Sequence, residues 1–216
     1  MFGGLFGSKK SGTGALASYN AAPRPNKNTP LAELELLAVD METTSLKAES
    51  GRILSIGWVP VRGGEIDLSG AGYVIVRQDG TGVGESATIH HLTDDEVATG
   101  IDEEEAVSRL LEALAGKALL AHFAVLETSF LDAACRRHFG GAFSAPVVDT
   151  FALERRHMER MGTYPRGEDL RLARVRTRYG LPSYRNHNAL TDALACAELY
   201  LALLGNIKGD TMKALG

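Results

Sequence analysis

Two carboxylates at a spacing of two residues follow directly after a short apolar run, and this feature constrains the fold most. The run is residues 34–39 (LELLAV), and residues 40–44 continue it as DMETT. A short, almost continuous apolar run is typical of a strand that is buried on both faces. Because side chains alternate across a strand, we expect Asp40 and Glu42 to project from the same face. Two adjacent anions at the end of a buried strand are stable only when they are protonated, solvated or bound to a cation.

Length and composition indicate an ordinary globular protein with one sizeable core. The chain has 216 residues, of which 44% are hydrophobic and 23% are charged. A net charge of −4 gives no overall sign of polyanion binding. Residues 152–187, however, carry nine arginines against four acidic residues, so one basic segment lies within an otherwise acidic chain.

The cysteines and the N-terminus indicate a cytoplasmic protein. Cys135 and Cys196 lie in alanine-rich stretches without metal-binding spacing, which is typical of small core residues in a reducing compartment. No stretch approaches the roughly 20 apolar residues that span a bilayer, and we expect no membrane association. Residues 1–7 are apolar, but a Lys-Lys pair follows them, which is the reverse of a secretory signal.

The chain divides into a central folded region between two short terminal segments. Residues 1–30 are rich in Gly, Ser, Lys, Asn and Pro, which predicts a flexible N-terminal tail. We expect one domain over residues 31–206 and a C-terminal tail over residues 207–216.

Strands and helices alternate after an initial group of three strands. Gly63-Gly64 provides a turn, which predicts that the second and third strands are antiparallel neighbours of the first. A capping box of Asp102 and Glu105 begins the first long helix. This order indicates an α/β domain with a mixed central sheet. The predicted strands are 34–39, 53–61, 72–76, 118–121 and 147–149, and the main helices are 102–115, one that ends at Gly140, one from Thr150, 169–179 and 189–204.

Four places carry acidic residues or histidines against apolar surroundings. Each alone has an ordinary explanation, such as a solvated strand end, a helix N-terminus, a loop histidine or a solvent-facing helix position. Together, acids at strand ends and helix starts suit hard divalent cations, which prefer oxygen ligands. The four places are Asp40 with Glu42, His122 with Glu127, His187, and Asp192.

These residues resemble the motifs of the DEDDh 3′→5′ exonucleases, the superfamily of the proofreading subunit of bacterial replicative DNA polymerase. The resemblance covers about residues 31 to 205, and the motifs occur in the family's order. Residues 40–44 match its DxETT motif, 89–93 (IHHLT) resemble its IHGIT-like segment, 122–131 resemble its second motif, and 187–192 (HNALTD) match its HxAxxD motif.

Three positions depart from the family's pattern. The second motif usually reads HNAxFD, whereas residues 122–127 read HFAVLE. Phe123 therefore replaces an Asn and Glu127 replaces an Asp, and Ser45 replaces the usual Gly after DxETT. Glu keeps the charge and adds one methylene group. The sequence as a whole most resembles a bacterial branch of the family in which Glu is common in the second motif.

The resemblance implies an RNase H-like fold, with a mixed five-stranded sheet flanked by helices, and a two-cation mechanism with Mg²⁺ or Mn²⁺. Asp40 would bridge the cations, Glu42 and Asp192 would complete one site, and Glu127 would hold the second. His187 would be the general base, because an imidazole exchanges protons near neutral pH. The same resemblance implies substrate contacts by Thr43, His90 and His122, and the basic segment predicts backbone contacts by Arg171, Arg174 and Arg178.

The implied reaction is release of nucleoside 5′-monophosphates from the 3′ end of single-stranded DNA. An oligoribonuclease-like enzyme acting on RNA is an alternative, because no residue indicates a 2′-hydroxyl contact. A degenerate domain that binds nucleic acid without cutting it is a second alternative, raised by Phe123 and Glu127. Instead of contacting a nucleic-acid backbone, the arginine-rich face could be an ordinary solvated helix surface. The sequence leaves three protein partners open: a polymerase, another protein, or a second copy of this chain.

Overall fold

The computed structural model describes residues 12–78, 98–184 and 187–216. His90 and the IHHLT segment that contains it lie outside these residues. The helices are α1 (Gly14–Ala21), α4 (Glu103–Leu114), α5 (Val125–Phe139), α6 (Thr150–Arg160), α7 (Leu172–Arg178) and α8 (Ala189–Leu204). The strands are β1 (Glu35–Thr43), β2 (Ile53–Arg62), β3 (Glu65–Ile66), β4 (Gly72–Ile75), β5 (Ala118–Ala121) and β6 (Val147–Asp149).

These strands form one mixed sheet, as the sequence predicts. Its order is β3-β2-β1-β5-β6, and β4 also pairs with β2. The pairing of β1 with β2 is antiparallel, whereas β1, β5 and β6 run parallel. The sheet differs from the expectation in two respects. The Gly63-Gly64 turn leads into the extra two-residue strand β3, and β4 pairs with β2 rather than lying beside β1.

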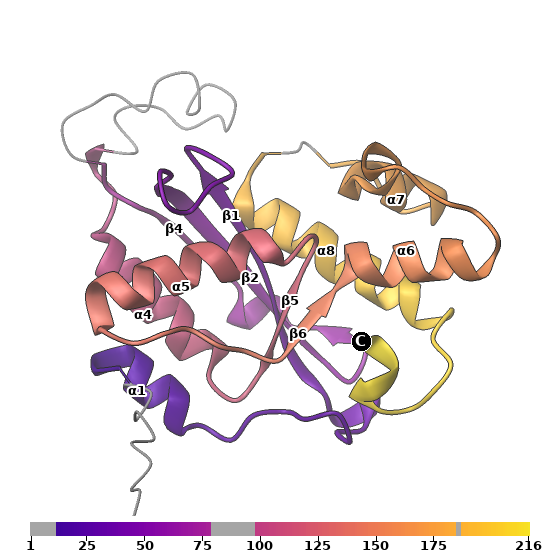
Figure 1. Ribbon diagram of the computed structural model, residues 1–216, viewed down its shortest axis with the longest axis horizontal. Coiled ribbons are helices and arrows are strands. Elements are labelled where there is room, and N and C mark those ends of the chain that lie inside the picture. Colours follow the sequence, from indigo (N-terminus) through magenta and orange to yellow (C-terminus); the bar gives the residue numbers. More distant parts are fainter. Residues whose placement is uncertain (1–11, 79–97, 185–186) are drawn as a thin grey trace, which may run out of the picture.

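Alternation along β1 divides the core into two layers. Leu37, Val39 and Met41 pack toward α1, α4 and α5, whereas Leu36 and Ala38 face the layer formed with α6, α7 and α8. Figure 1 shows the two groups of helices on opposite sides of the strands. Every one of these β1 side chains is at least 96% buried, because both faces of the strand are covered. Asp40 and Glu42 continue the face that α8 covers.

Two local expectations about helices were wrong in detail. Asp102 precedes α4, but its carboxylate caps no backbone group of the helix and pairs with Arg77 instead. Glu105 pairs with Arg109 one turn later, so no capping box forms. The helix predicted over residues 169–179 is a 3₁₀ turn over Gly167–Leu170 followed by the shorter α7.

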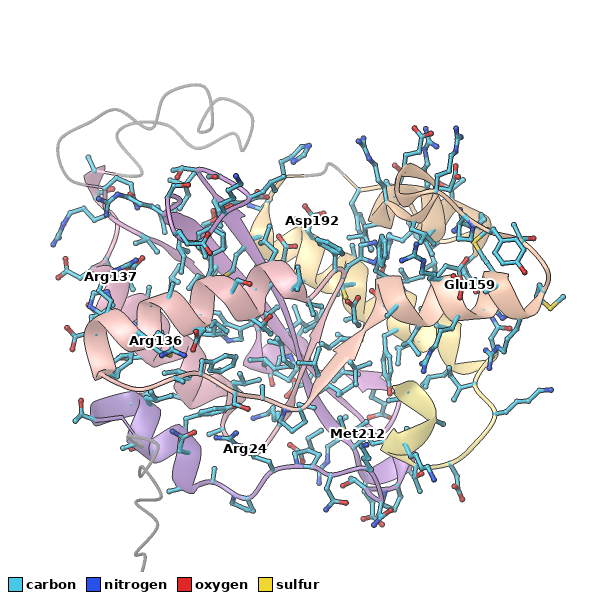
Figure 2. The ribbon with its side chains drawn as sticks, in the orientation of Figure 1. Arg24, Arg136, Arg137, Glu159, Asp192 and Met212 are labelled. Carbon is cyan, nitrogen blue, oxygen red and sulfur yellow. The ribbon has the colours of Figure 1, made fainter. Side chains whose placement is uncertain are left out.

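The N-terminal segment is not a tail over its described part. Within it, α1 packs against α4 and α5, and its Leu16 and Tyr19 are fully buried. The Tyr19 hydroxyl donates to the carbonyl oxygen of Ser144, and the guanidinium of Arg24, labelled in Figure 2, lies 4.3 Å from the centre of the Tyr19 ring. The expectation of a tail over residues 1–30 therefore fails for residues 14–21.

The C-terminal segment is also part of the fold. A short 3₁₀ helix covers Met212–Leu215, and both of its end residues are buried against the α8 layer. Thr211 bridges to Pro30, and Arg156 donates to the carbonyl oxygen of Leu215. The expected C-terminal tail is thus wrong for these residues. Across the described ranges, the helices are all too short or too polar to cross a membrane.

Leu16→Ala should lower the free energy of unfolding by about 2–5 kcal/mol, because it leaves a cavity between α1 and the core. Ser18→Ala on the exposed side of the same helix is the matched control and should change it by less than about 0.5 kcal/mol. Urea unfolding monitored by circular dichroism measures both. Equal midpoints for the two variants would show that α1 is a dispensable appendage.

Candidate active site

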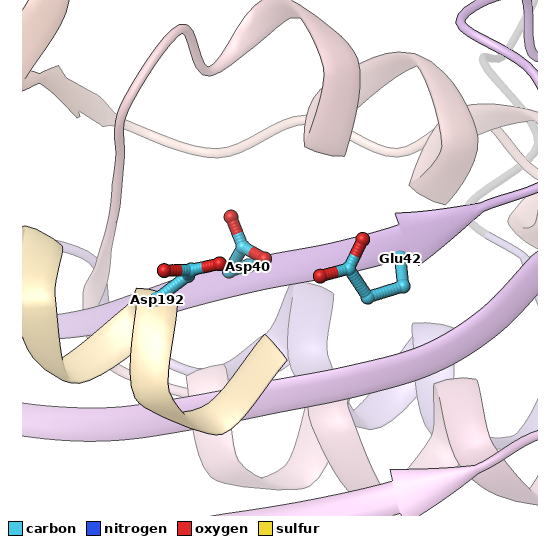
Figure 3. Close-up of side chains that lie close together, drawn as sticks. All are labelled: Asp40, Glu42 and Asp192. Atoms are coloured by element: carbon cyan, nitrogen blue, oxygen red, sulfur yellow. The ribbon is translucent and has the colours of Figure 1, made fainter. Parts of the chain in front are cut away.

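Three carboxylates meet where β1 and α8 come together. Asp40 and Glu42 project from β1, and Asp192 projects from the first turn of α8. One oxygen of each lies within 4.8 Å of the others. Figure 3 shows the three groups turned toward one another. The spacing of two on β1 thus predicts a shared face, and the fold brings the third acid to it.

A glycine allows α8 to approach the sheet this closely. Gly57 on β2 lies opposite Asp40 in the antiparallel register. A Cβ at Gly57 would lie 2.2 Å from the backbone nitrogen of Leu190 and 2.3 Å from the carbonyl carbon of Ala189. The first turn of α8 therefore rests on the bare backbone of β2, which places Asp192 beside Asp40. Sequence reasoning missed Gly57, although a glycine inside a strand signals close backbone approach.

His187 is held by one of these carboxylates. The backbone N–H of His187 donates to Oδ2 of Asp192 over 2.8 Å. His187 has a φ of 72°, in the left-handed region that non-glycine residues rarely adopt. The next residue, Asn188, caps α8 by accepting from the backbone N–H of Thr191. Asp192 therefore fixes the backbone that carries the predicted general base.

Glu127 completes a ring of acids around Asp40. It lies in the first turn of α5 and is only 3% exposed, and its Oε2 has no hydrogen-bond partner in the described part of the chain. Figure 2 shows Asp192 near the N-terminal end of α5. Glu127 lies outside the tightest cluster, but its charge acts directly on Asp40. An orphaned, buried carboxylate oxygen is costly, which favours a cation as its partner.

Burial raises the pKa of all four acids, and neighbouring negative charges raise the pKa of Asp40, Glu42 and Glu127 further. Burial raises the pKa of Asp40 well above its ordinary value, and the charges of Glu127, Glu42 and Asp192 raise it further. Burial followed by the charge of Asp192 raises the pKa of Glu42 to about 7. Burial and then Asp149 raise the pKa of Glu127 to about 8. Burial also raises the pKa of Asp192, against the opposing effect of the His187 N–H. The metal-free site therefore holds protons near neutral pH.

His122 anchors one wall of the site. Its Nε2–H donates to the carbonyl oxygen of Leu170 over 2.7 Å, and its Nδ1 accepts from the hydroxyl of Thr150 over 2.8 Å. Burial lowers the pKa of His122, in keeping with a neutral ring. Both ring nitrogens are thus bonded within the protein. His122 lines both clefts. Its predicted contact with the substrate would have to use the ring carbons, or break one of these two hydrogen bonds.

Asp149 holds the turn that precedes α5 and was missed by sequence reasoning. Its Oδ1 accepts from the N–H of Phe123 over 2.9 Å, and its Oδ2 accepts from Ala124 over 3.1 Å. Oδ1 also caps α6 by accepting from Phe151. Phe123 has a φ of 73°, so it is the second non-glycine residue in the left-handed region. The available signal was the position of Asp149 at the end of a short strand, like that of Asp40.

The carboxylates separate two clefts of different character. One, of about 400 Å³, is lined by Thr43, Leu46, Phe123 and Leu126 besides the acids. The other, of about 450 Å³, is lined by Arg171, Leu172, Ala173 and Arg174. Asp40, His122, His187 and Asp192 line both. One side of the centre is therefore largely apolar and the other is basic.

The predicted arginine face is only partly available for binding. Arg171 and Arg174 line the basic cleft, and Arg174 also lies 3.4 Å from Asp169. Arg178 instead pairs with the buried Glu154 over 3.0 Å and donates to the carbonyl oxygen of Asp169. Arg178 lines neither cleft, so its contact with a nucleic-acid backbone stays a prediction that the ion pair with Glu154 would oppose.

A larger cavity elsewhere has no comparable chemistry. It measures about 730 Å³ and lies along the start of α4. Charged groups of its lining pair with one another, as in Arg77 with Asp102 and Arg137 with Glu103. Its acids therefore already have cationic partners, unlike the ring around Asp40.

The comparisons with known proteins agree with this geometry. The model of the RNase_T family, described as exonuclease, matches residues 37–200. The DNA polymerase III subunit epsilon of Treponema pallidum is 31% identical over 78% of this chain and 76% of its own length. A DNA polymerase III PolC-type protein of Thermotoga maritima is 24% identical over 88% of this chain. The matched region is only 13% of the length of that protein.

Solved exonucleases share the fold. Exonuclease X in complex with 5′ overhanging duplex DNA has a TM-score of 0.62 and 22% identity over 83% of this chain and 97% of its own. Exonuclease I of E. coli in complex with an oligonucleotide has a TM-score of 0.65 and 13% identity, over 81% of this chain and 41% of its own. The fold and the acidic site define a DEDD-type exonuclease, a phosphodiester hydrolase. The chain belongs to the exonuclease family whose model spans residues 37–200.

The residues present fit the divalent cations that such enzymes use. All four acids offer oxygen ligands, which hard cations prefer. One oxygen from each of three acids already lies within 4.8 Å of the others, and the fourth acid has a buried oxygen without a hydrogen-bond partner in the ranges that the structure describes. A bound cation would also relieve the repulsion that raises the pKa values of these groups.

Gly57→Ala should displace the first turn of α8 and lower the free energy of unfolding by about 1–3 kcal/mol, the usual cost of overpacking. Because the turn carries Asp192, the stabilisation by added Mn²⁺ should shrink as well. Gly205→Ala at the other end of α8 is the matched control, since its nearest contact is an ordinary 3.7 Å. Thermal melts with and without Mn²⁺ measure both effects. An unchanged Mn²⁺ response in Gly57→Ala would refute this role of the close contact.

Without divalent cations, the melting temperature should fall as pH rises from about 5 to about 8.5. Glu42 and Glu127, with folded pKa values of about 7 and about 8, hold protons that the unfolded chain releases near 4.5. The unfolded state therefore binds fewer protons in this window, and stability decreases with pH. Glu127→Gln should make the melting temperature fall less steeply with pH, whereas Glu112→Gln at an exposed position of α4 should not. Thermal melts in chelator across this pH range test the prediction, and parallel slopes for the two variants would contradict it.

Proposed function

We propose that this chain removes nucleoside 5′-monophosphates from the 3′ end of single-stranded DNA with the help of two divalent cations, Mg²⁺ or Mn²⁺. The observation that carries the proposal is the cluster of Asp40, Glu42 and Asp192 with the buried Glu127 near it, whose Oε2 has no hydrogen-bond partner among the described residues. The name of the Treponema pallidum relative, a DNA polymerase III subunit, supports DNA as the substrate.

The cations would be held by this chain's carboxylates. Asp40 lies centrally and faces the other three acids, which suits a ligand shared between two ions. Glu42 and Asp192 would complete one site, and Glu127 would serve the other. When bound, divalent cations stabilise the negative charge that develops on the incoming and leaving oxygens of a phosphodiester. Carboxylates with raised pKa values must release their protons for this to occur, so binding should strengthen as pH rises.

His187 would take the proton from the attacking water. Its side chain is exposed at the mouth of both clefts, and its backbone is tied to the ligand Asp192. General-base catalysis requires a base held within hydrogen-bonding reach of the water. The bond between the His187 N–H and Asp192 would provide that placement. The leaving group is the 3′-oxygen of the penultimate nucleotide, which regenerates a 3′ end one nucleotide shorter.

The two clefts support a path for the strand across the acids. Arg171 and Arg174 would contact phosphates on the basic side, with Thr43 on the apolar side. A polymerase is the protein partner that the relative's name supports, and a homodimer is the alternative. The role of His90 stays a prediction, because that residue lies outside the described ranges.

The cleavage experiment uses 5′-labelled single-stranded DNA, RNA and duplex DNA, each with Mg²⁺, Mn²⁺ or chelator. The proposal expects a ladder on single-stranded DNA with either cation, mononucleotide product, and no product in chelator. Asp40→Asn is the inactive control, because it removes the central ligand. Binding without cleavage by the parent protein would support the degenerate-domain alternative, and faster cleavage of RNA would assign the oligoribonuclease-like one.

His187→Ala should lower the turnover number by a factor on the order of 10²–10⁴, the usual contribution of a general base. The cation-induced rise in melting temperature should persist, because the variant keeps all four acids. His157→Ala on α6, outside both clefts, is the matched control and should keep the parent's rate. A His187→Ala rate within a few-fold of the parent's at neutral pH would exclude His187 as the base.

A further inference from the structure

The aromatic ring of Phe123 lies at an unusual place in the fold. It is 49% exposed, although large apolar side chains near the centre of a protein are usually covered. It lines the apolar cleft together with Asp40, Glu42 and Glu127. The ring therefore has one face available at the acidic centre itself.

The backbone beneath this ring is strained. A φ of 73° is rare for a bulky residue, whereas asparagine adopts such values readily. Strain of this kind persists only where surrounding contacts enforce it, and it is common at functional sites. An asparagine would therefore satisfy the turn better than Phe123 does. The turn alone gives no reason for an aromatic side chain.

Neighbouring contacts fix the ring in one orientation. Both oxygens of Asp149 accept backbone N–H groups of the turn, from Phe123 and Ala124. The ring of Phe151 packs against Phe123 in an edge arrangement, with centroids 5.2 Å apart. One side of the Phe123 ring is thus supported by the protein, and the exposed remainder borders the cleft.

The chemistry of the cleft identifies what would cover the exposed face. The substrate class of this exonuclease family carries flat, apolar base faces beside each phosphate. Aromatic side chains bind such bases by stacking, with little dependence on sequence because every base has a π-face. The opposite cleft is basic through Arg171 and Arg174, which suits phosphates rather than bases.

We propose that Phe123 is the residue against which the 3′-terminal base of the substrate stacks, so that the site senses an unpaired base without reading its identity. This inference rests on the proposed function and adds a substrate-positioning residue to it. Stacking on a ring that is already fixed places the terminal nucleotide over the acids at little entropic cost. A base that is paired to a second strand has to leave its partner first, which favours single-stranded ends.

The test measures stacking directly in the Asp40→Asn background, where binding is not followed by cleavage. The probe is an oligodeoxythymidylate with 2-aminopurine as its 3′-terminal base, whose fluorescence is quenched by stacking. The Phe123 protein should quench the probe on binding. Phe123→Ala and Phe123→Asn should lose the quench and weaken binding by about 5- to 100-fold, the range for one aromatic–base stack. Phe123→Tyr should retain it.

Two controls separate stacking from misfolding. Val125→Ala, an exposed apolar neighbour outside both clefts, should leave the quench and the affinity unchanged. Phe123→Asn should melt at or above the parent's temperature, because asparagine accepts the left-handed backbone. A substrate with an abasic 3′-terminal nucleotide should bind the Phe123 protein as weakly as the normal substrate binds Phe123→Ala.

Failure of this inference differs from failure of the proposed function. If the protein cleaves 3′ ends but Phe123→Ala and Phe123→Asn quench and bind like the parent, the stacking role is wrong and the proposed function stands. If the parent protein neither binds nor cleaves any oligonucleotide, both proposals are overturned.

Discussion

Repulsion among buried carboxylates is the constraint on which the rest of this structure depends. Asp40, Glu42, Glu127 and Asp192 gather at one site; burial raises the pKa of each, and the charges of neighbouring acids add to this for Asp40, Glu42 and Glu127. An unpaired buried charge costs several kcal/mol, so the surrounding fold has to be stable enough to hold the acids together. Close packing supplies that stability, with β1 covered on both faces and α8 in direct contact with Gly57.

The same site contains the two non-glycine residues in the described chain that adopt a left-handed backbone. Phe123 and His187 lie on different segments, yet each is held by a nearby aspartate that accepts its backbone N–H. Asp149 restrains Phe123, and Asp192 restrains His187. The acids of the site therefore have a mechanical role besides their charge. Removal of either aspartate would therefore free the backbone of Phe123 or His187 and also change the electrostatics of the site.

Much of the site could be predicted from the sequence, because its signals are local. The alternation on β1 predicts that Asp40 and Glu42 share a face, and the motif at residues 187–192 indicates the third acid. Long-range pairing leaves no local signal. Nothing near Arg178 in sequence indicates its partner Glu154, 24 residues away. The sequence therefore predicts more unpaired arginines on this face than the structure has. The glycine- and serine-rich segment around Leu16 likewise gives no local signal for α1, because this helix is stabilised by tertiary packing.

The two clefts and the acids together explain how an acidic centre can receive a polyanion. Once the four acids have released their protons, a phosphodiester placed between the basic cleft and the apolar cleft would face four carboxylates, and Coulomb repulsion would oppose its binding. Arg171 and Arg174 offset the repulsion at one side only. Under the proposed function, binding of the scissile phosphate would therefore depend on cations held by these acids. Cation binding, substrate binding and catalysis would in this way be coupled, and the raised pKa values of the acids would keep the empty site protonated until a cation binds.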